Sequence, residues 1–354
     1  MGVAEETLSR NPASERMDLA FDGIRMTIFS NSASLLEKLK RYFDGFIVSG
    51  TGREGIRIYA IDGPAPEFPG ESLTIKQPDP GKTRIKEEYI EFADGRVVRK
   101  RLTGMVFAFG PGLNLAVGPS LDNDNQVVNF INSRFIQAEL SAGSLLAHAA
   151  GVAAGGRGLA VAGFSGMGKS TLALHLLGHG LDFISNDRLM VRREGNVAVM
   201  KGVAKLPRIN PGTALNNEKL KAVMTPEDRD RFSSLGPDEL WRLEHKYDVF
   251  IDDLYGKGRF TLAGVMSSLV ILNWSRGVES FDARRVDPRE RRDLLAAFMK
   301  SAGLFYLPDG DGSDTPPSEE QYLDVLERTD VYEITGGVDF DQATGVCLDI
   351  LGGQ

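Results

Sequence analysis

The chain has 354 residues, of which 42% are hydrophobic and 25% are charged, enough apolar material for two domains of ordinary size. Its net charge of −8 lacks the positive charge typical of nucleic-acid-binding proteins, and its single cysteine, Cys347, excludes an intrachain disulfide and a cysteine-based zinc cluster. The polar N-terminus does not resemble a secretory signal, and no apolar run has membrane-spanning length. We therefore expect a cytoplasmic protein with no nucleic-acid or membrane partner, and composition leaves a homo-oligomer open.

The first third of the chain is predicted to be rich in strands. We expect a disordered tail over residues 1–16 and a β-rich accessory domain over 17–122, because short β-branched or alternating apolar segments are separated by turn residues. One helix is expected over 33–43, and the pair Asp94-Gly95 favours a hairpin. No catalytic motif occurs here, so this domain is interpreted as accessory, with partner recognition or oligomerisation as the functional alternative.

The pattern changes to alternating helices and strands after residue 122. A helix over 125–141 is followed by an apolar strand over 158–163, a glycine-rich segment, a helix over 170–180 and a strand over 182–191. This order is typical of an α/β fold, so we expect 123–354 to form one such domain with a helical C-terminal extension. The helices expected in that extension cover 289–303 and 320–329.

The glycine-rich segment GFSGMGKST predicts a phosphate-binding loop, or P-loop. Gly163, Gly168, Lys169 and Ser170 fit the template G-x-x-x-x-G-K-[ST], between the strand and the helix that this template requires. Loop amides and the helix N-terminus bind polyphosphate oxygens, while the lysine reaches the β- and γ-phosphates and the serine ligates Mg²⁺. The alternative is a turn that binds nothing. The nucleotide-binding residues expected are Gly163, Ser165, Gly166, Met167, Gly168, Lys169, Ser170 and Thr171.

The acidic residue that usually accompanies a P-loop is missing from its ordinary place. Most P-loop enzymes hold the metal with an Asp at the end of a later strand. Here the best later strand, SSLVILNWS, ends in Asn273 and Trp274, and no guanine-reading N-K-x-D segment occurs. The nearest acid at a strand end is Asp187, 18 positions after Lys169. One helix and one strand would return the chain beside the loop at that spacing, so Asp187 is predicted to hold Mg²⁺ together with Ser170.

This arrangement resembles the catalytic domain of HPr kinase/phosphorylase, a bacterial protein-serine kinase family whose fold is akin to phosphoenolpyruvate carboxykinase. The family pattern has a His before the P-loop and an Asp-Asp pair after the following strand. His148, GFSGMGKS and Asn186-Asp187 match it, and the resemblance covers about residues 130–275. It implies a P-loop sheet flanked by helices. It also implies an ATP- and Mg²⁺-dependent kinase that phosphorylates a hydroxyl of a protein, on serine, or of a small molecule.

The segments GVAKLPRINPG and LEHKYDV look like the HPr-kinase-related type called kinase B. The chain departs from the family pattern in two respects. Asn186 replaces one acid of the pair, so Asp187 must carry most of the metal handling and hydroxyl activation. The Glu-x-Arg-Gly-x-Gly signature of the phosphorylase reaction is absent, and Lys205 and Arg208 stand in its place. The resemblance therefore does not extend to reverse phosphorolysis, nor to HPr as the acceptor.

Three further side chains complete the predicted catalytic set, together with Asp187. By resemblance, His148 lies near the γ-phosphate or the metal, although a lone His among alanines is also typical of a packed residue. Arg208 and Arg259 are candidates for stabilising charge on the transferred phosphoryl group, and are otherwise solvated surface charges. Two rival functions remain open: a nucleotide-binding regulator that senses ATP without transferring phosphate, and a metabolite kinase.

Overall fold

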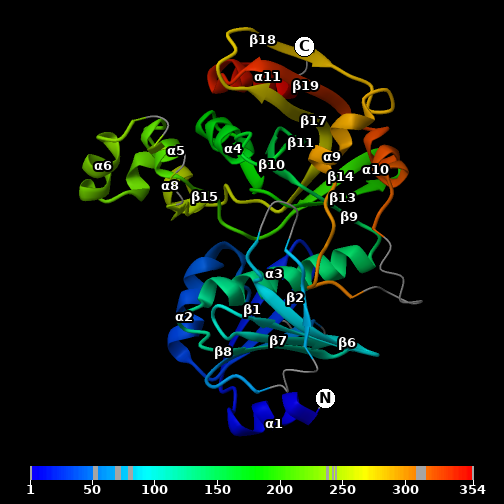
Figure 1. Ribbon diagram of the computed structural model, residues 1–354. Coiled ribbons are helices and arrows are strands. Elements are labelled where there is room, and N and C mark those ends of the chain that lie inside the picture. The colour runs from blue at the N-terminus through cyan, green and yellow to red at the C-terminus, as the bar shows by residue number, and fades with distance from the viewer. Residues whose placement is uncertain are drawn as a thin grey trace. The chain divides into compact units, whose positions relative to one another are not determined.

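The protein is a mixed α/β structure in a computed structural model (Figure 1). It forms two compact units: Met1–Ser141 joined by the described part of Ala302–Asp314, and Ala142–Ser301 joined by Thr315–Gln354. The helix expected at the start of the P-loop domain therefore belongs to the first unit. The structure describes residues 2–50, 55–67, 73–78, 83–236, 239–240, 243, 245–307 and 316–352.

The first unit contains an eight-stranded sheet in the order β1-β2-β3-β8-β7-β6-β5-β4. The β2–β3 and β3–β8 pairs are parallel and the others antiparallel. The predicted hairpin joins β5 to β6, with Phe92 opposite Gly95, so its turn lies one residue earlier than expected. The strands are β1 Glu15–Phe21, β2 Ile24–Ser30, β3 Ile56–Asp62, β4 Thr74–Ile75, β5 Glu87–Phe92, β6 Gly95–Lys100, β7 Val106–Gly110 and β8 Leu113–Gly118.

The N-terminal segment, expected to be a disordered tail, contains a helix. Helix α1, Gly2–Arg10, places Ala4 and Leu8 against the apolar side chains of Val97, Leu115 and Val117 on the sheet. Two apolar residues one helical turn apart are enough to dock a short helix, but they give a weak sequence signal. The other helices of this unit are α2 Ala33–Tyr42, the 3₁₀ turn η1 Asp44–Phe46 and α3 Asp124–Ser141.

Two sheets of the second unit share one long strand, β17 (Ala263–Ser275). Its first residues pair with β14 in a sheet ordered β9-β13-β14-β17, and its remainder runs parallel to both β11 and β19. The second sheet is ordered β12-β10-β11-β17-β19-β18. The remaining strands are β9 Leu145–Ala147, β10 Ala149–Ala154, β11 Arg157–Gly163, β12 Asp182–Ser185, β13 Leu189–Glu194, β14 Val197–Gly202, β18 Phe281–Arg285 and β19 Asp330–Gly337.

The C-terminal region is not the helical extension expected from the sequence. β18 and β19 add two strands to the sheet, and the helix expected over 289–303 is reduced to the 3₁₀ turn η4 (Arg292–Leu294) and α9 (Leu295–Phe298). The helix expected over 320–329 is present as α10, Glu319–Leu326. An insertion between β14 and β17 holds the short pair β15 Arg208–Ile209 and β16 Tyr247–Asp248, α5 Pro211–Leu215, η3 Leu220–Val223, α6 Pro226–Ser233 and α8 Ile251–Tyr255.

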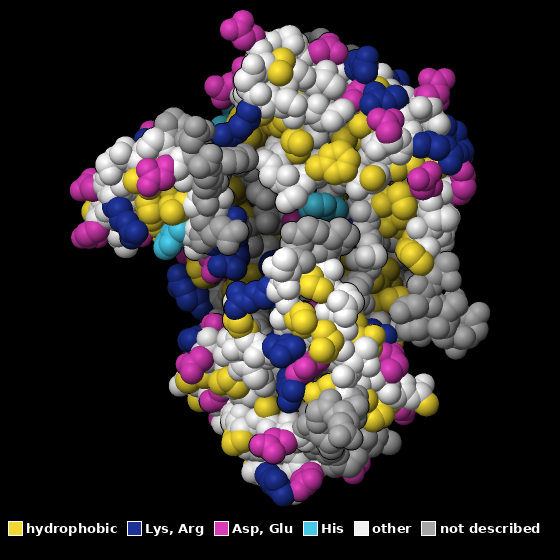
Figure 2. Space-filling model, in the orientation of Figure 1, with side chains coloured by type: hydrophobic (Ala, Val, Ile, Leu, Met, Phe, Trp, Pro, Cys, Tyr) yellow, Lys and Arg dark blue, Asp and Glu magenta, His cyan; other side chains and the backbone are white. Residues whose placement is uncertain are grey.

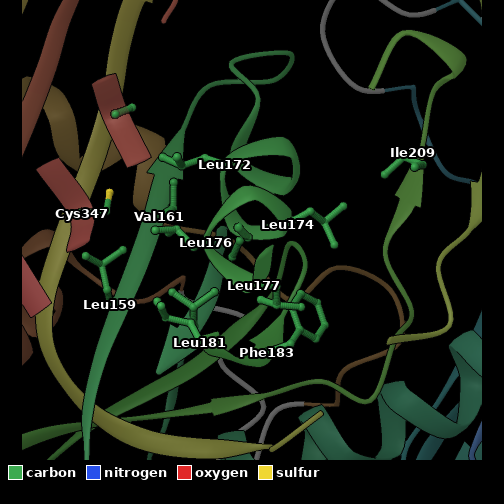
Figure 3. Packing of buried hydrophobic residues seen from close by; sticks show 14 of the residues in the cluster. Leu159, Val161, Leu172, Leu174, Leu176, Leu177, Leu181, Phe183, Ile209 and Cys347 are labelled. Carbon is green, nitrogen blue, oxygen red and sulfur yellow. The ribbon is translucent and has the colours of Figure 1, made fainter. Parts of the chain in front are cut away.

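Helices cover both faces of the sheet that contains β11. On one face, leucines of α4 (Lys169–Gly178) pack with Leu159 and Val161 and with Cys347 of α11 (Phe340–Gly352), as Figure 3 shows. On the other face, Ala160 and Ala162 pack with side chains of α9 and α10. From Gly158 onward β11 is apolar because both of its faces are buried, which is typical of a strand with parallel pairing. This packing fixes the strand that leads into the P-loop.

The surface of the second unit over α10 carries interspersed charges of both signs, visible in Figure 2 as alternating dark blue and magenta side chains. Arg292 pairs with Glu320 at 2.6 Å, and Arg289 pairs with Glu327 at 2.7 Å. Exposed pairs of this kind contribute about 0–1 kcal/mol each to stability, so they add little beyond the core. Within the described residues, no helix is both long and apolar enough to cross a membrane.

Candidate nucleotide-binding site

The P-loop joins the end of β11 at Gly163 to the start of α4 at Lys169, in the strand–loop–helix order expected from the sequence. Gly166 and Gly168 have φ of 85° and 88°, a left-handed backbone that favours glycine. The Lys169 side chain is buried, and its Nζ donates hydrogen bonds to the carbonyl oxygens of Gly163 at 2.8 Å and Phe164 at 3.4 Å. The loop thus closes around a cation, which is the arrangement that receives a phosphate group.

Side chains from distant elements hold the loop in this shape. The Trp274 indole nitrogen, at the end of β17, donates to the Met167 carbonyl at 3.0 Å. The Phe340 ring, at the start of α11, packs against Gly168 so closely that an added Cβ would lie 2.5 Å from it. Phe340 also contacts the Trp274 ring at 5.2 Å between centroids. Sequence reasoning missed both aromatics, because neither lies in a local pattern that includes the loop.

His148 lies where the chain passes from one sheet of the second unit to the other. It separates β9 from β10, and its backbone N–H donates to the Phe298 carbonyl at 2.6 Å. In the β10–β11 pair, Ala149 faces Ala162, the residue before Gly163. His148 therefore directly precedes the strand position that faces the last residues of β11, at which the P-loop begins.

The segment Asn186–Arg188 makes the reverse passage between the same two sheets, from β12 to β13. Leu189 faces Ala147 in the β13–β9 pair, so Arg188 and His148 each adjoin the end of that ladder, and the Arg188 charge acts on His148. The buried Ser185 hydroxyl donates to the Arg188 carbonyl at 2.5 Å and accepts the Val203 N–H at 3.4 Å, which fixes the turn. The two sheet crossings lie side by side, and this brings Asp187 into the neighbourhood of His148.

Burial and positive charge dominate the electrostatics of this cluster. Burial lowers the pKa of Lys169 to about 8, opposed by the nearby Asp187 carboxylate, and Lys300 lowers it further. Burial also lowers the pKa of His148 to about 4, and the Lys169 charge adds to that effect. His148 is consequently neutral at pH 7, whereas its cationic neighbours give the site an affinity for anions.

Lys205 lies close enough to Asp187 and Arg188 for their charges to act on it. Burial lowers the pKa of Lys205, while Asp187 raises it and the charges of Arg188 and Arg208 lower it. The site thus contains several cations and one central carboxylate, a balance that suits a polyphosphate ligand better than a neutral one.

The side chains around Asp187 fit Mg²⁺ bound together with nucleotide. The Asp187 carboxylate, the Ser170 hydroxyl and the Asn186 amide are hard oxygen ligands, and Asn186 Oδ1 is buried with no hydrogen-bond partner among the described residues. No cluster of three His, Cys, Asp or Glu able to hold a metal occurs in the described part of the chain. Mg²⁺ does not require one, since it is commonly bound through one or two carboxylates and the phosphates themselves.

Each of the two predicted arginines, Arg208 and Arg259, is paired with an aspartate outside the P-loop. Arg259 Nη1 donates to the Gly180 carbonyl at 2.8 Å and to Asp182 Oδ1 at 2.9 Å, at the start of β12. Asp187 follows the other end of that strand, roughly 10 Å of β-strand away. Arg259 was expected to act on the transferred phosphoryl group. Its ion pair with Asp182 instead holds it at the start of β12, away from Asp187. Arg208 is half-exposed and pairs with Asp248 at 3.2 Å across β15 and β16.

A carboxylate also lies near the end of β17, where ordinary P-loop enzymes have their acid. Glu333 on the neighbouring strand β19 accepts a hydrogen bond from Asn273 at 2.8 Å, but it also pairs with Arg284 at 2.9 Å and with Arg291 at 2.5 Å. Its side chain is 1% exposed. Two guanidinium groups already neutralise this buried acid, so Asp187 remains the carboxylate available to a ligand at the P-loop.

Comparison with solved structures gives distant structural likenesses. Neither the protein-family models nor the curated proteins give a match to this sequence. Among solved structures, the chain is similar to an HPr(Ser) kinase/phosphatase from Coxiella burnetii, with 12% sequence identity and a TM-score of 0.29. The likeness covers 58% of this chain and 93% of that one. A TM-score this low does not by itself establish a shared fold or activity.

Proposed function

We propose that the protein is an ATP-dependent kinase that transfers the γ-phosphoryl group to a hydroxyl of a protein, on serine, or of a small molecule. One observation supports the proposal most: the ladder beside the P-loop ends at Ala149 and Ala162, the ladder beside the Asp187 turn ends at Ala147 and Leu189, and His148 separates the two. A phosphate cradle next to a carboxylate without an ion-pair partner supplies the two functions that phosphoryl transfer needs, which are binding and activation of the acceptor.

Each side chain then has a distinct task. Lys169 and the loop amides bind the β- and γ-phosphates, and Ser170 and Asp187 would hold Mg²⁺, which neutralises phosphate charge when bound. Asp187 accepts the proton of the acceptor hydroxyl. At the same time the hydroxyl oxygen forms a bond to the γ-phosphorus, and the bond from that phosphorus to the β,γ-bridging oxygen breaks. His148, neutral at pH 7 because of its low pKa, offers a hydrogen bond without an added charge. ADP leaves with the bridging oxygen.

A specific observation supports one alternative, an ATP-binding regulator without transfer activity. Asn186 stands beside Asp187, and an amide cannot accept the acceptor's proton at neutral pH. A site with one carboxylate must hold the metal and activate the hydroxyl with the same group, which favours slow transfer or none. The kinase remains the better-supported proposal, because Asp187 has no ion-pair partner in the described part of the chain.

Incubation of the purified protein with γ-labelled ATP, Mg²⁺ and lysate of the native cells tests the proposal. A labelled protein band that is lost with Lys169→Ala supports a protein kinase. Label confined to small molecules supports a metabolite kinase. Binding of ATP without transfer of any label identifies the regulator and overturns the kinase proposal.

A further inference from the structure

We propose that Arg188 is a catalytic residue of this site and that its guanidinium contacts the transferring phosphoryl group. The inference rests on the proposed kinase function and assigns a residue that the sequence analysis did not consider. Arg188 directly follows Asp187 in the turn between β12 and β13. The next residue, Leu189, pairs with Ala147 on one side and Gly202 on the other, and the Ser185 hydroxyl donates to the Arg188 carbonyl. Its backbone is therefore fixed at the edge where the P-loop begins.

The hydrogen bonding of the Arg188 side chain differs from that of the two arginines expected at the site; Arg229 also has a buried Nε without a partner in the described part of the chain, but its Nη2 donates to the Met224 carbonyl. The Arg188 Nε is buried and has no hydrogen-bond partner among the described residues, and no carboxylate there lies within ion-pair distance of it. By contrast, Arg259 is paired with Asp182, and Arg208 with Asp248. A partly buried guanidinium without a counter-ion costs stability, and such a group is retained where a ligand supplies the negative charge.

The chemistry of phosphoryl transfer needs a group of this kind. As the acceptor oxygen bonds to the γ-phosphorus and the bond to the bridging oxygen of ADP breaks, negative charge spreads over the three equatorial oxygens. A guanidinium offers a planar pair of N–H donors that matches two such oxygens, which an ammonium group cannot do. Lys169 contacts the β- and γ-phosphates in the ground state as well as in the transition state, so it contributes to ATP binding. Arg188 would contact the group that moves, so its contribution appears in the rate more than in ATP affinity.

Affinity for a transition-state analogue tests this division of roles without knowledge of the acceptor. The probes are MgATP, and MgADP with aluminium fluoride, titrated against wild type, Arg188→Ala and the matched control Arg259→Ala. We expect Arg188→Ala to bind MgATP within about threefold of wild type and to lose about 100-fold or more in affinity for the aluminium fluoride complex, since tighter analogue binding reports transition-state contacts. Equal losses for both ligands, or no loss for the analogue, would overturn the assignment.

Chemical rescue separates a contact with the phosphoryl group from a purely structural role. The readout is single-turnover release of phosphate from γ-labelled ATP, with water as the acceptor. We expect Arg188→Ala to be about 10³-fold slower, as for arginines that act on phosphoryl groups. Added guanidinium should restore part of the rate to this variant and none to Asp187→Asn. The rate of Arg188→Lys should be lower than the rate of Arg188→Ala with added guanidinium, because lysine keeps the charge but lacks the planar pair of N–H donors.

The outcomes distinguish failure of the residue assignment from failure of the kinase proposal. If wild type turns over and Lys169→Ala does not, but Arg188→Ala equals wild type, the function stands and the Arg188 assignment is wrong. If wild type shows no turnover in either the water or the lysate reaction, the kinase proposal fails and the assignment fails with it. Arg188→Ala could also lose activity, show no rescue by guanidinium and melt at a lower temperature than wild type. That result would assign Arg188 a structural role instead.

Discussion

The two ends of strand β12 contain the same kinds of residue in opposite states. At its start, Asp182 and Arg259 form an ion pair at 2.9 Å, and Arg259 also donates to the Gly180 carbonyl. After its end, Asp187 and Arg188 are neighbours in sequence, yet neither has an ion-pair partner among the described residues. An acid and an arginine that satisfy each other stabilise a fold, whereas the same pair left unsatisfied beside a P-loop is available to a ligand.

Replacement of the two aspartates should give the largest contrast between the ends. Asp187→Asn is expected to lower single-turnover transfer by about 10²–10⁴-fold, because the site loses its proton acceptor, while ATP affinity stays substantial. Asp182→Asn should leave transfer near the wild-type rate and lower the melting temperature slightly, since its pair is partly exposed. Rapid-quench measurements with γ-labelled ATP compare the two, and near wild-type transfer by Asp187→Asn would place the carboxylate elsewhere.

Removal of the buried Lys169 amine should weaken the binding of MgATP at the P-loop. Lys169→Ala is expected to weaken MgATP binding by about 10–100-fold, since a charge-assisted hydrogen bond contributes about 1.5–3 kcal/mol. Lys219→Ala is the matched control, because the exposed Lys219 amine lies over the Tyr255 ring rather than in the P-loop. Calorimetric titration measures both. Unchanged affinity in a folded Lys169→Ala protein would contradict the P-loop assignment.

The shape of the loop can be disturbed without any change in charge. Gly168→Ala forces a side chain into a backbone with φ of 88° and toward the Phe340 ring, so we expect a loss of about 1–3 kcal/mol in stability and weaker ATP binding. Gly178→Ala in the same helix has open space and should be neutral or stabilising by up to about 1 kcal/mol. Denaturant unfolding of both variants gives the comparison. Equal stability would show that the Phe340 contact does not constrain the loop.

The last prediction concerns pH, and the effect of pH on stability through His148 vanishes at neutral pH. The pKa of His148 is about 4 in the folded protein, below its ordinary 6.5, so the unfolded chain binds more protons between these values. Its contribution to stability is therefore fully present above pH 6.5 and is lost as the pH falls toward 4. His148→Gln should flatten this part of the stability profile, measured as melting temperature from pH 7 to pH 4. Parallel profiles for the two proteins would show that His148 titrates normally.

Local patterns in the sequence predicted the strand, the glycine-rich loop and the helix around Lys169, because these residues are contiguous. The single strand expected over 182–191 is wrong, since it divides into β12 and β13 at the turn that contains Asp187. The sequence did not indicate Arg188, because its position near His148 depends on the pairing of the following strand, β13, with β9. It did not indicate Phe340 either, because that residue contacts the loop from the last helix. Arg259 was misplaced because nothing local indicates that Asp182 would hold it. The strands β18 and β19 were missed because their polar residues hide the β-pattern.

Hydrogen exchange measured with and without MgATP tests most directly whether the two ends of β12 differ in function. Nucleotide held by the loop and by the Asn186–Arg188 turn should slow amide exchange in peptides covering 163–171 and 184–190. Peptides covering 178–182 and 257–261, around the Asp182–Arg259 pair, should exchange as before. Protection confined to the Asp182–Arg259 end, or none at the P-loop, would contradict the assignment of the site.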